Sequence, residues 1–167
     1  MRVGIIGGGT MGAVHAAAWR STQARLIGCV SAQQSQSDQL AALHGIRHYN
    51  AFADLLEDVD IVDICTPTET HKSIVLEAAQ AGKHVLCEKP IALRQEDAEA
   101  MIQACQKAGV RFFVCMVLRF FPQYRLAKDL VNEGKIGNLT VLRLKRVSYR
   151  PQKKAITGIS MNRARVA

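Results

Sequence analysis

The sequence predicts an α/β fold with a doubly wound, Rossmann-type parallel sheet. Short apolar segments of the kind that form buried strands alternate with longer segments of helical periodicity, without internal repeats or low-complexity stretches. The first apolar segment runs directly into a glycine-rich turn. Of the 167 residues, 49% are hydrophobic and only 5% are aromatic, which suits an aliphatic interior and one domain, or one domain and a fragment.

The glycine-rich turn follows an expected strand at residues 3–6 and precedes an expected helix at 11–20. It fits the pattern G-x-G-x-x-G at Gly7, Gly9 and Gly12. Gly7 permits a tight turn, Gly9 lets the backbone approach a pyrophosphate, and Gly12 lets the helix pack close to the strand. The start of the helix offers free N–H groups to the phosphates. This unit therefore predicts a dinucleotide-binding site.

The remaining elements follow in alternation. Further strands are expected at 24–31, 61–65, 83–87 and 111–117. Further helices are expected at 35–44, 51–56, 94–107 and 122–133, together with one that follows the loop 66–71 and ends at residue 81. Ligands of open parallel sheets lie over the carboxyl ends of the strands. The loop 66–71 and the segment 88–90 each follow a strand, so we expect both at the same rim of the sheet.

The choice between NAD and NADP stays open at this stage. In NAD-binding units an acid at the end of the second strand binds the ribose 2′-hydroxyl. This sequence has Ser31 at that place and no acid before Asp38. No Lys or Arg stands there to attract a 2′-phosphate either.

Charge and cysteine content limit the classes of function. The net charge of +8 comes from the end of the chain, because residues 1–118 hold ten basic and twelve acidic side chains. A basic end is typical of nucleic-acid or membrane binding, or of a domain separated from the acidic residues that would pair with it. We favour the last interpretation and expect neither a nucleic-acid nor a membrane partner. The five cysteines form no C-x-x-C pair, and no segment has the length of a membrane span or the form of a secretory signal. We therefore expect a reduced, cytoplasmic protein.

Four motifs resemble one known family. They are Gly7–Gly12 with His15, Cys65-Thr66-Pro67 with His71, Glu88-Lys89-Pro90, and Leu118-Arg119-Phe120-Phe121-Pro122. In this order and spacing they look like the Gfo/Idh/MocA oxidoreductases, over residues 1–147. The resemblance implies a Rossmann domain followed by an α/β domain with an open, mostly antiparallel sheet. It also implies an NAD- or NADP-dependent transfer of hydride to or from a sugar, a cyclitol or a related alcohol or carbonyl compound.

The resemblance also assigns roles to residues. Lys89 matches the family lysine that meets the substrate oxygen beside the nicotinamide, and Arg119 matches an arginine at the nicotinamide side of the cleft. His15 and His71 receive supporting roles, and Pro90 is a candidate for a cis bond. Lys89 is the one candidate catalytic residue, and no metal site is expected. The candidate cofactor-binding residues are Gly7, Gly9, Thr10, Met11, Gly12, Ser31, Thr66, Pro67, His71, Glu88, Lys89 and Arg119.

The end of the chain departs from the family. We expect a Rossmann domain at 1–119, a linking helix and the first strand (139–147) of a truncated substrate domain at 120–147, and a disordered tail at 148–167. The family's Asp-x-x-x-His motif is missing, since every histidine precedes residue 85. We therefore expect this chain to bind cofactor without turnover and to self-associate as a homo-oligomer. A non-catalytic dinucleotide-binding module or redox sensor is the alternative function, and a nucleic-acid binder is the least supported.

Overall fold

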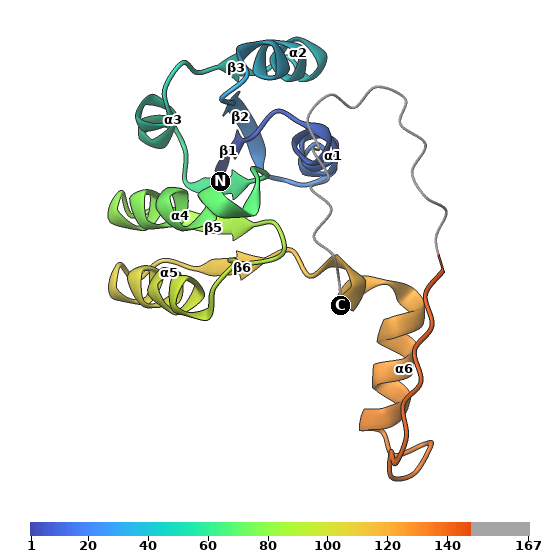
Figure 1. Ribbon diagram of the computed structural model, residues 1–167. Helices are drawn as coiled ribbons and strands as arrows, with labels where there is room; N and C mark the ends of the chain where they lie inside the picture. Colours follow the sequence, from blue (N-terminus) through green and yellow to red (C-terminus); the bar gives the residue numbers. More distant parts are fainter. Residues whose placement is uncertain (148–167) are drawn as a thin grey trace, which may run out of the picture. The chain divides into compact units, whose positions relative to one another are not determined.

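A six-stranded sheet lies at the centre of the first compact unit, which spans Met1–Cys115 (Figure 1). The computed structural model describes residues 1–147. The strands are β1 (Arg2–Ile6), β2 (Arg25–Val30), β3 (Arg47–His48), β4 (Ile61–Ile64), β5 (His84–Cys87) and β6 (Phe112–Val114). Their order is β3-β2-β1-β4-β5-β6, and every neighbouring pair is parallel. The strand order reverses beside β1, so the carboxyl ends of β1 and β4 flank the topological switch point at which such sheets bind ligands.

Helices cover both faces of this sheet, as the prediction of a doubly wound fold requires. They are α1 (Thr10–Trp19), α2 (Gln34–His44), α3 (Phe52–Asp58), α4 (His71–Gln80) and α5 (Gln95–Lys107), with a short 3-10 turn, η1 (Thr68–Thr70), before α4. Figure 1 shows α3, α4 and α5 together on one side of the sheet and α1 on the other. The predicted fold class is therefore confirmed.

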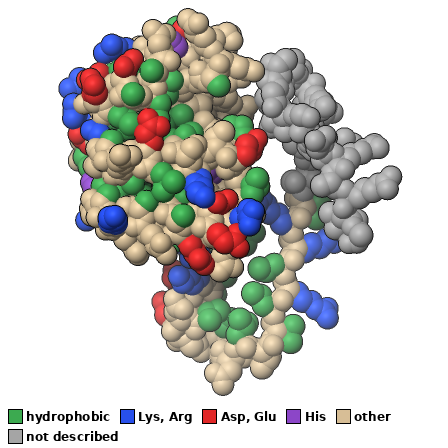
Figure 2. Space-filling view, turned by 60° about the vertical axis from the view of Figure 1, so that its left-hand side comes forward, with side chains coloured by type: hydrophobic (Ala, Val, Ile, Leu, Met, Phe, Trp, Pro, Cys, Tyr) green, Lys and Arg blue, Asp and Glu red, His purple; other side chains and the backbone are tan. Residues whose placement is uncertain are grey.

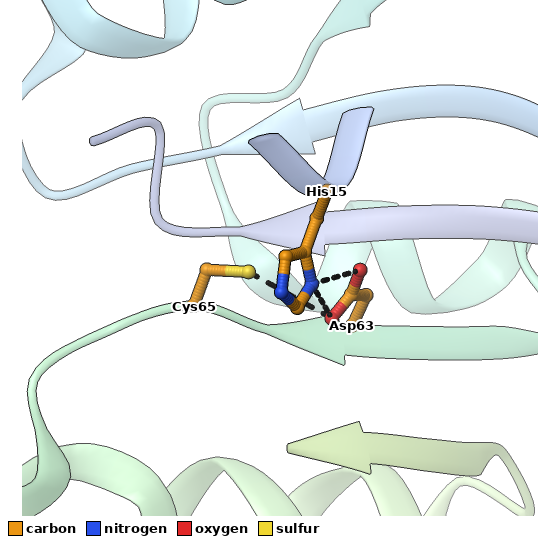
Figure 3. A group of neighbouring side chains, drawn as sticks. All are labelled: His15, Asp63 and Cys65. Atoms are coloured by element: carbon orange, nitrogen blue, oxygen red, sulfur yellow. Dashed lines mark hydrogen bonds and ion pairs between the residues drawn. The ribbon is translucent and has the colours of Figure 1, made fainter. Parts of the chain in front are cut away.

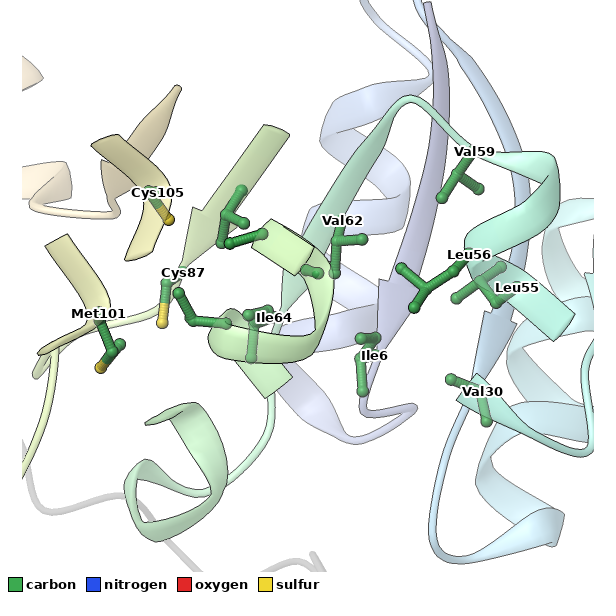
Figure 4. Close-up of a cluster of buried hydrophobic side chains, with 14 of the residues drawn as sticks. Ile6, Val30, Leu55, Leu56, Val59, Val62, Ile64, Cys87, Met101 and Cys105 are labelled. Carbon is green, nitrogen blue, oxygen red and sulfur yellow. The ribbon is translucent and has the colours of Figure 1, made fainter. Parts of the chain in front are cut away.

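Two buried clusters hold the helices on the sheet. On one face, α3 packs against β1 and β2, α4 packs against β4 and β5, and α5 packs beside α4, with Leu55, Val75 and Met101 fully buried in one cluster (Figure 4). On the other face, Ala16 of α1 and Leu40 of α2 pack on Ile5 and Cys29. Because α1 meets the sheet through alanine, its backbone lies close to β1, and its amino end is held beside the loop that follows this strand.

One short strand differs from the sequence-based expectation. The edge strand β3 consists of Arg47 and His48, which pair with Gly28 and Cys29 of β2. Its polar side chains give no apolar run, so periodicity does not reveal it. Gly28 makes the pairing possible: a Cβ there would lie 2.5 Å from the carbonyl oxygen of Arg47 and 2.4 Å from the ring of Tyr49.

The second unit begins at Met116. Its described elements are the 3-10 turn η2 (Val117–Phe120) and the helix α6 (Pro122–Asn132), which starts with proline in its first turn as helices commonly do. The strand expected at 139–147 is wrong, because the structure has no strand in that segment. A strand needs a partner edge for its N–H and C=O groups, and the described residues supply none to it.

The predicted disordered tail at 148–167 lies outside the described residues, and the predicted domain boundaries stay predictions. No helix among residues 1–147 has the length and apolar character needed to cross a membrane.

Candidate functional site

Two glycines of the loop after β1 and one in the first turn of α1 are required by the chain's own packing. Gly7 has a φ of 97°, a left-handed conformation that favours glycine, and its N–H donates to the carbonyl of Val30 at 2.8 Å. A Cβ on Gly8 would lie 2.8 Å from the backbone of Gln36. A Cβ on Gly12 would lie 2.0 Å from the carbonyl oxygen of Gly7. These glycines shape the turn and bring α1 against the sheet.

Gly9 is different, because neither conformation nor packing requires a glycine there. Its φ of −74° is open to any residue. Among the residues that the structure describes, a Cβ on Gly9 would meet only the side-chain oxygen of Gln36, at 3.8 Å. Gly9 is also the N-cap of α1, whose first N–H groups have no side-chain cap. The free space beside a bare backbone at a helix start fits a pyrophosphate, which is the group that the sequence motif predicts there.

Ser31 and the loop after β4 lie at the same edge of the sheet. Ser31 directly follows β2, is half-buried, and has no charged neighbour in sequence before Asp38. Thr66 and Pro67 follow the switch-point strand β4 after Cys65. The hydroxyl of Thr70 bonds to both, at 2.7 Å from Thr66 Oγ1 and 2.8 Å from the carbonyl oxygen of Pro67. These bonds fix the backbone of the loop in front of α4.

His71 connects this loop to the segment after β5. It is the first residue of α4 and is 1% exposed. Its Nε2 lies 3.0 Å from the carbonyl oxygen of Thr66, and its Nδ1 lies 3.1 Å from that of Pro90 and 3.2 Å from that of Ile91. Both ring nitrogens therefore face the protein's own backbone. The supporting role of His71 is evident from these contacts, while a direct contact with the cofactor stays a prediction.

The segment after β5 presents Lys89 to solvent above a buried carboxylate. Glu88 is only 5% exposed, and its Oε2 accepts a hydrogen bond of 2.9 Å from the backbone N–H of Lys89. The side chain of Lys89 is 57% exposed, and its Nζ lies 3.9 Å from the same oxygen. The Lys89–Pro90 peptide bond is cis. The ammonium group of Lys89 is therefore accessible and has a fixed negative partner beneath it.

Glu88 belongs to a cluster of four hydrogen-bonded side chains, which we call the His15 cluster. It consists of His15 and Trp19 from α1, Asp63 from β4, and Glu88. Nδ1 of His15 lies 3.0 Å from both carboxylate oxygens of Asp63, and its Nε2 lies 3.1 Å from Oε1 of Glu88. Trp19 donates its indole N–H to Asp63 at 2.6 Å. Figure 3 shows His15 reaching down from α1 to Asp63, with Cys65 beside them.

The His15 cluster favours a charged imidazole. The hydrogen bond to Asp63 raises the pKa of His15 above its usual value, against the lowering effect of burial, and the charge of Asp63 and the bond to Glu88 raise it further. Sequence reasoning gave His15 a supporting role but missed Asp63 and Trp19. The available signal was an acid inside the apolar strand run Ile61-Val62-Asp63-Ile64, where a fully buried carboxylate needs a partner.

The same region brings together atom sets of a kind that can bind metals. His15, Asp63 and Cys65 form one set, and His15, Glu88 and Cys115 form another. However, both ring nitrogens of His15 already have carboxylate partners. Burial also raises the pKa of Cys65 and raises that of Cys115 to about 12, which disfavours the thiolate that a metal requires. The arrangement is better described as a hydrogen-bonded cluster.

Arg119 lies in η2 of the second unit. Its candidate role at the nicotinamide stays a prediction, as do the direct cofactor contacts of Thr10 and Met11 in the exposed first turn of α1.

Comparison with known proteins identifies the family. Residues 1–116 match the family model GFO_IDH_MocA, "Oxidoreductase family, NAD-binding Rossmann fold". The chain belongs to this family. The resemblance inferred from the four motifs is confirmed, and the family description makes a nicotinamide dinucleotide, NAD or NADP, the cofactor of the fold.

Curated relatives of this Gfo/Idh/MocA chain include enzymes with different names. It is 34% identical over 148 residues to myo-inositol 2-dehydrogenase of Thermotoga maritima, covering 86% of this chain and 44% of the relative. It is 41% identical over 101 residues to 2,7-anhydro-N-acetylneuraminate hydratase of Mediterraneibacter gnavus, covering 60% of this chain and 27% of the relative. The chain thus spans less than half the length of these relatives.

A solved structure of similar fold contains the cofactor. The WlbA dehydrogenase from Bordetella pertussis, in complex with NADH and UDP-GlcNAcA, superposes with a TM-score of 0.76 at 32% identity, covering 82% of this chain and 41% of that chain. The similarity supports the Rossmann architecture described above. What the relatives act on is a property of those proteins.

Proposed function

We propose that this chain is the cofactor-binding part of an NAD(P)-dependent oxidoreductase that acts on a sugar, a cyclitol or a related alcohol or carbonyl compound. The observation that carries the proposal is Gly9, a glycine at the start of α1 that neither backbone conformation nor packing requires. A bare backbone at a helix start is what close approach of a pyrophosphate needs. The match of residues 1–116 to a family with an NAD-binding Rossmann fold supports it.

The residues of this chain divide the work between binding and proton transfer. The bound nicotinamide would supply the hydride chemistry. The first N–H groups of α1 hold the phosphates, and Ser31 lies where the adenosine ribose is expected. Lys89 stabilises a developing alkoxide and moves a proton at the substrate oxygen, which is the role that an exposed ammonium group at the rim of the sheet supports.

The first test of the proposal is a binding measurement on this chain. Titration of NADH and NADPH, followed by nicotinamide fluorescence, should give saturable binding. The nicotinamide absorbance is then monitored with the oxidised cofactors and a panel of sugars and cyclitols. Absence of binding to both dinucleotides would contradict the proposal, and reduction of NAD or NADP by one substrate class would name that class.

A second candidate function is a dinucleotide-binding module or redox sensor without catalysis. It is favoured by one observation, that the features of the glycine loop and of the start of α1 concern binding of the dinucleotide alone. Binding without turnover across the whole panel supports this candidate. The same measurement tests the expectation that this chain binds cofactor and does not turn over.

The proposal extends to assembly and location. Four apolar side chains between Leu139 and Leu144 are half to three-quarters exposed, which supports self-association into a homo-oligomer. Sedimentation velocity at increasing protein concentration tests this.

All five cysteines are free thiols, which supports a reducing, cytoplasmic location. On the large body of the molecule in Figure 2, side chains of both charges are mixed, which supports a role without nucleic acid; salt-dependent binding of DNA or RNA would contradict this part of the proposal.

A further inference from the structure

The His15 cluster joins the helix that binds phosphate to the segment that carries Lys89. His15 lies in the second turn of α1, whose first turn is at the glycine loop. Asp63 lies in the switch-point strand β4, and Glu88 directly follows β5. The bonds between these residues span 48 and 73 positions of the sequence. The cluster is therefore a tertiary connection between two parts of the candidate site.

The two carboxylates of the cluster depend on His15. Asp63 is 0% exposed and Glu88 is 5% exposed, and a buried carboxylate without a partner is strongly unfavourable. Asp63 has a second donor in Trp19. On Glu88, one oxygen accepts from Lys89 and the other faces His15. Rotation of the Glu88 carboxylate would therefore disturb both contacts together.

Only the doubly protonated imidazole can donate to both carboxylates. A neutral ring carries one N–H, so its other nitrogen would present a lone pair to a carboxylate. The proton is best kept at Nδ1, which faces two oxygens of Asp63 at 3.0 Å. On loss of a proton, Oε1 of Glu88 therefore loses its donor. The remaining titratable groups around His15 are the thiols of Cys65 and Cys115, and burial keeps both neutral by raising their pKa values.

We propose that His15 is a positioning residue for Lys89: its doubly protonated ring fixes the carboxylate of Glu88, and Glu88 in turn fixes the backbone and the ammonium group of Lys89. This inference rests on the proposed function only for the role of Lys89 as the proton-transfer residue. It adds that loss of the proton from His15 releases one side of Glu88. The placement of Lys89 then depends on the protonation state of His15.

The test uses NMR spectroscopy of this chain, because the backbone amide of Lys89 donates to Glu88 and reports on its carboxylate. The ring nitrogens of His15 and the amide of Lys89 are followed over the same pH titration. In the wild type, the Lys89 amide should shift over the interval in which His15 titrates. In His15→Gln this response should disappear. The matched control is His48→Gln, which removes a histidine on β3 that bonds to Asn50, and it should leave the response unchanged.

A second variant keeps the ring in place. Asp63→Asn preserves the shape of the side chain but removes its charge, so His15 should titrate at a pH lower by about one unit or more. The response of the Lys89 amide should move with it. A Lys89 amide that ignores the titration of His15 in the wild type, or does not follow the shift in Asp63→Asn, overturns the inference. Asp63→Asn decides the matter if His15→Gln does not fold.

The same samples separate this inference from the proposed function. NADH and NADPH are titrated into each of them. Wild type that binds neither dinucleotide contradicts the proposed function, although coupling between His15 and Lys89 can still be observed. Wild type that binds a dinucleotide but shows no coupling contradicts the positioning role alone.

Discussion

The carbonyl oxygen of Gly7 occupies the space that a side chain on Gly12 would need. A Cβ on Gly12 would lie 2.0 Å from that oxygen, far inside any normal contact. The oxygen belongs to the backbone, so no flexible side chain can move aside. Because Gly12 has no Cβ, the first turn of α1 can lie this close to the loop after β1.

Gly12→Ala should therefore destabilise the fold. We expect a loss of about 1–3 kcal/mol, the usual range for overpacking a close contact, measured by urea unfolding. The matched control is Gly9→Ala at the N-cap of the same helix, whose Cβ would meet only Gln36 among the described residues; its loss should be about 1 kcal/mol or less. Equal stability of the wild type and Gly12→Ala would show that the loop can move away from the helix.

Gly9→Val should remove cofactor binding while leaving the sheet folded. Its side chain would fill the space in which the pyrophosphate is expected, since within residues 1–147 the only neighbour of its Cβ is Gln36. We expect the affinity for NADH to fall at least about tenfold, or about 1.4 kcal/mol, with an unchanged circular dichroism spectrum. Gly109→Asn, at the end of α5, serves as the control, and unaltered NADH affinity in Gly9→Val contradicts the assignment of the loop.

Ser31 should leave the chain tolerant of both cofactors. No charged residue between β2 and Asp38 attracts or repels a 2′-phosphate. The affinities for NADH and NADPH should therefore lie within about tenfold of each other. Ser31→Asp should weaken NADPH at least about tenfold by adding a repulsive charge. Ser31→Asn is the neutral control of the same shape. If Asp and Asn have the same effect, Ser31 does not face the 2′ position.

Lys89→Ala should separate binding from chemistry. Its side chain is exposed, so NADH affinity should stay within about threefold of the wild type. Under any condition in which the protein turns over a substrate, kcat should fall by about 10²–10⁴. Lys107→Ala, at the exposed end of α5, is the control. Near wild-type turnover in Lys89→Ala would remove this lysine from the mechanism.

His15 should make stability depend on pH in a defined direction. Its pKa is raised in the folded chain, chiefly by the hydrogen bond to Asp63. The stabilisation is therefore complete below its unfolded pKa of about 6.5 and is lost as the pH rises through the folded pKa. The free energy of unfolding is measured in urea at about pH 6 and about pH 9. His15→Gln should cost more at the lower pH, and an equal cost at both would contradict a charged ring.

Apart from the edge strand β3, the local elements of residues 1–115 could be predicted, while the connections between them could not. Periodicity and glycine spacing gave the strand–turn–helix unit around Gly7 and the segment that ends in Lys89. They gave no reason to pair His15 with Asp63, because residues 48 positions apart meet only once the parallel sheet has formed. The strand expected at 139–147 shows the opposite error. Alternating apolar residues indicate that a segment can form a strand, but a strand exists only when a partner edge is present.

The helix α1 contributes to two places in the molecule, and this limits how its sequence can drift. Its amino end lies at the glycine loop, while His15 and Trp19 bond to groups below the helix. The positions of α1 that face the sheet are Gly12, His15, Ala16 and Trp19. Substitutions there should be disfavoured for two separate reasons, close packing at Gly12 and Ala16 and hydrogen bonding at His15 and Trp19. Selection for a folded protein should preserve Gly12 and Ala16 and should accept at His15 only changes that leave Asp63 and Glu88 with hydrogen-bond partners. Selection for activity should add the requirement for a protonated ring next to Glu88. A comparison of the two selections on one library of this helix would separate residues that hold the fold from residues that serve the reaction.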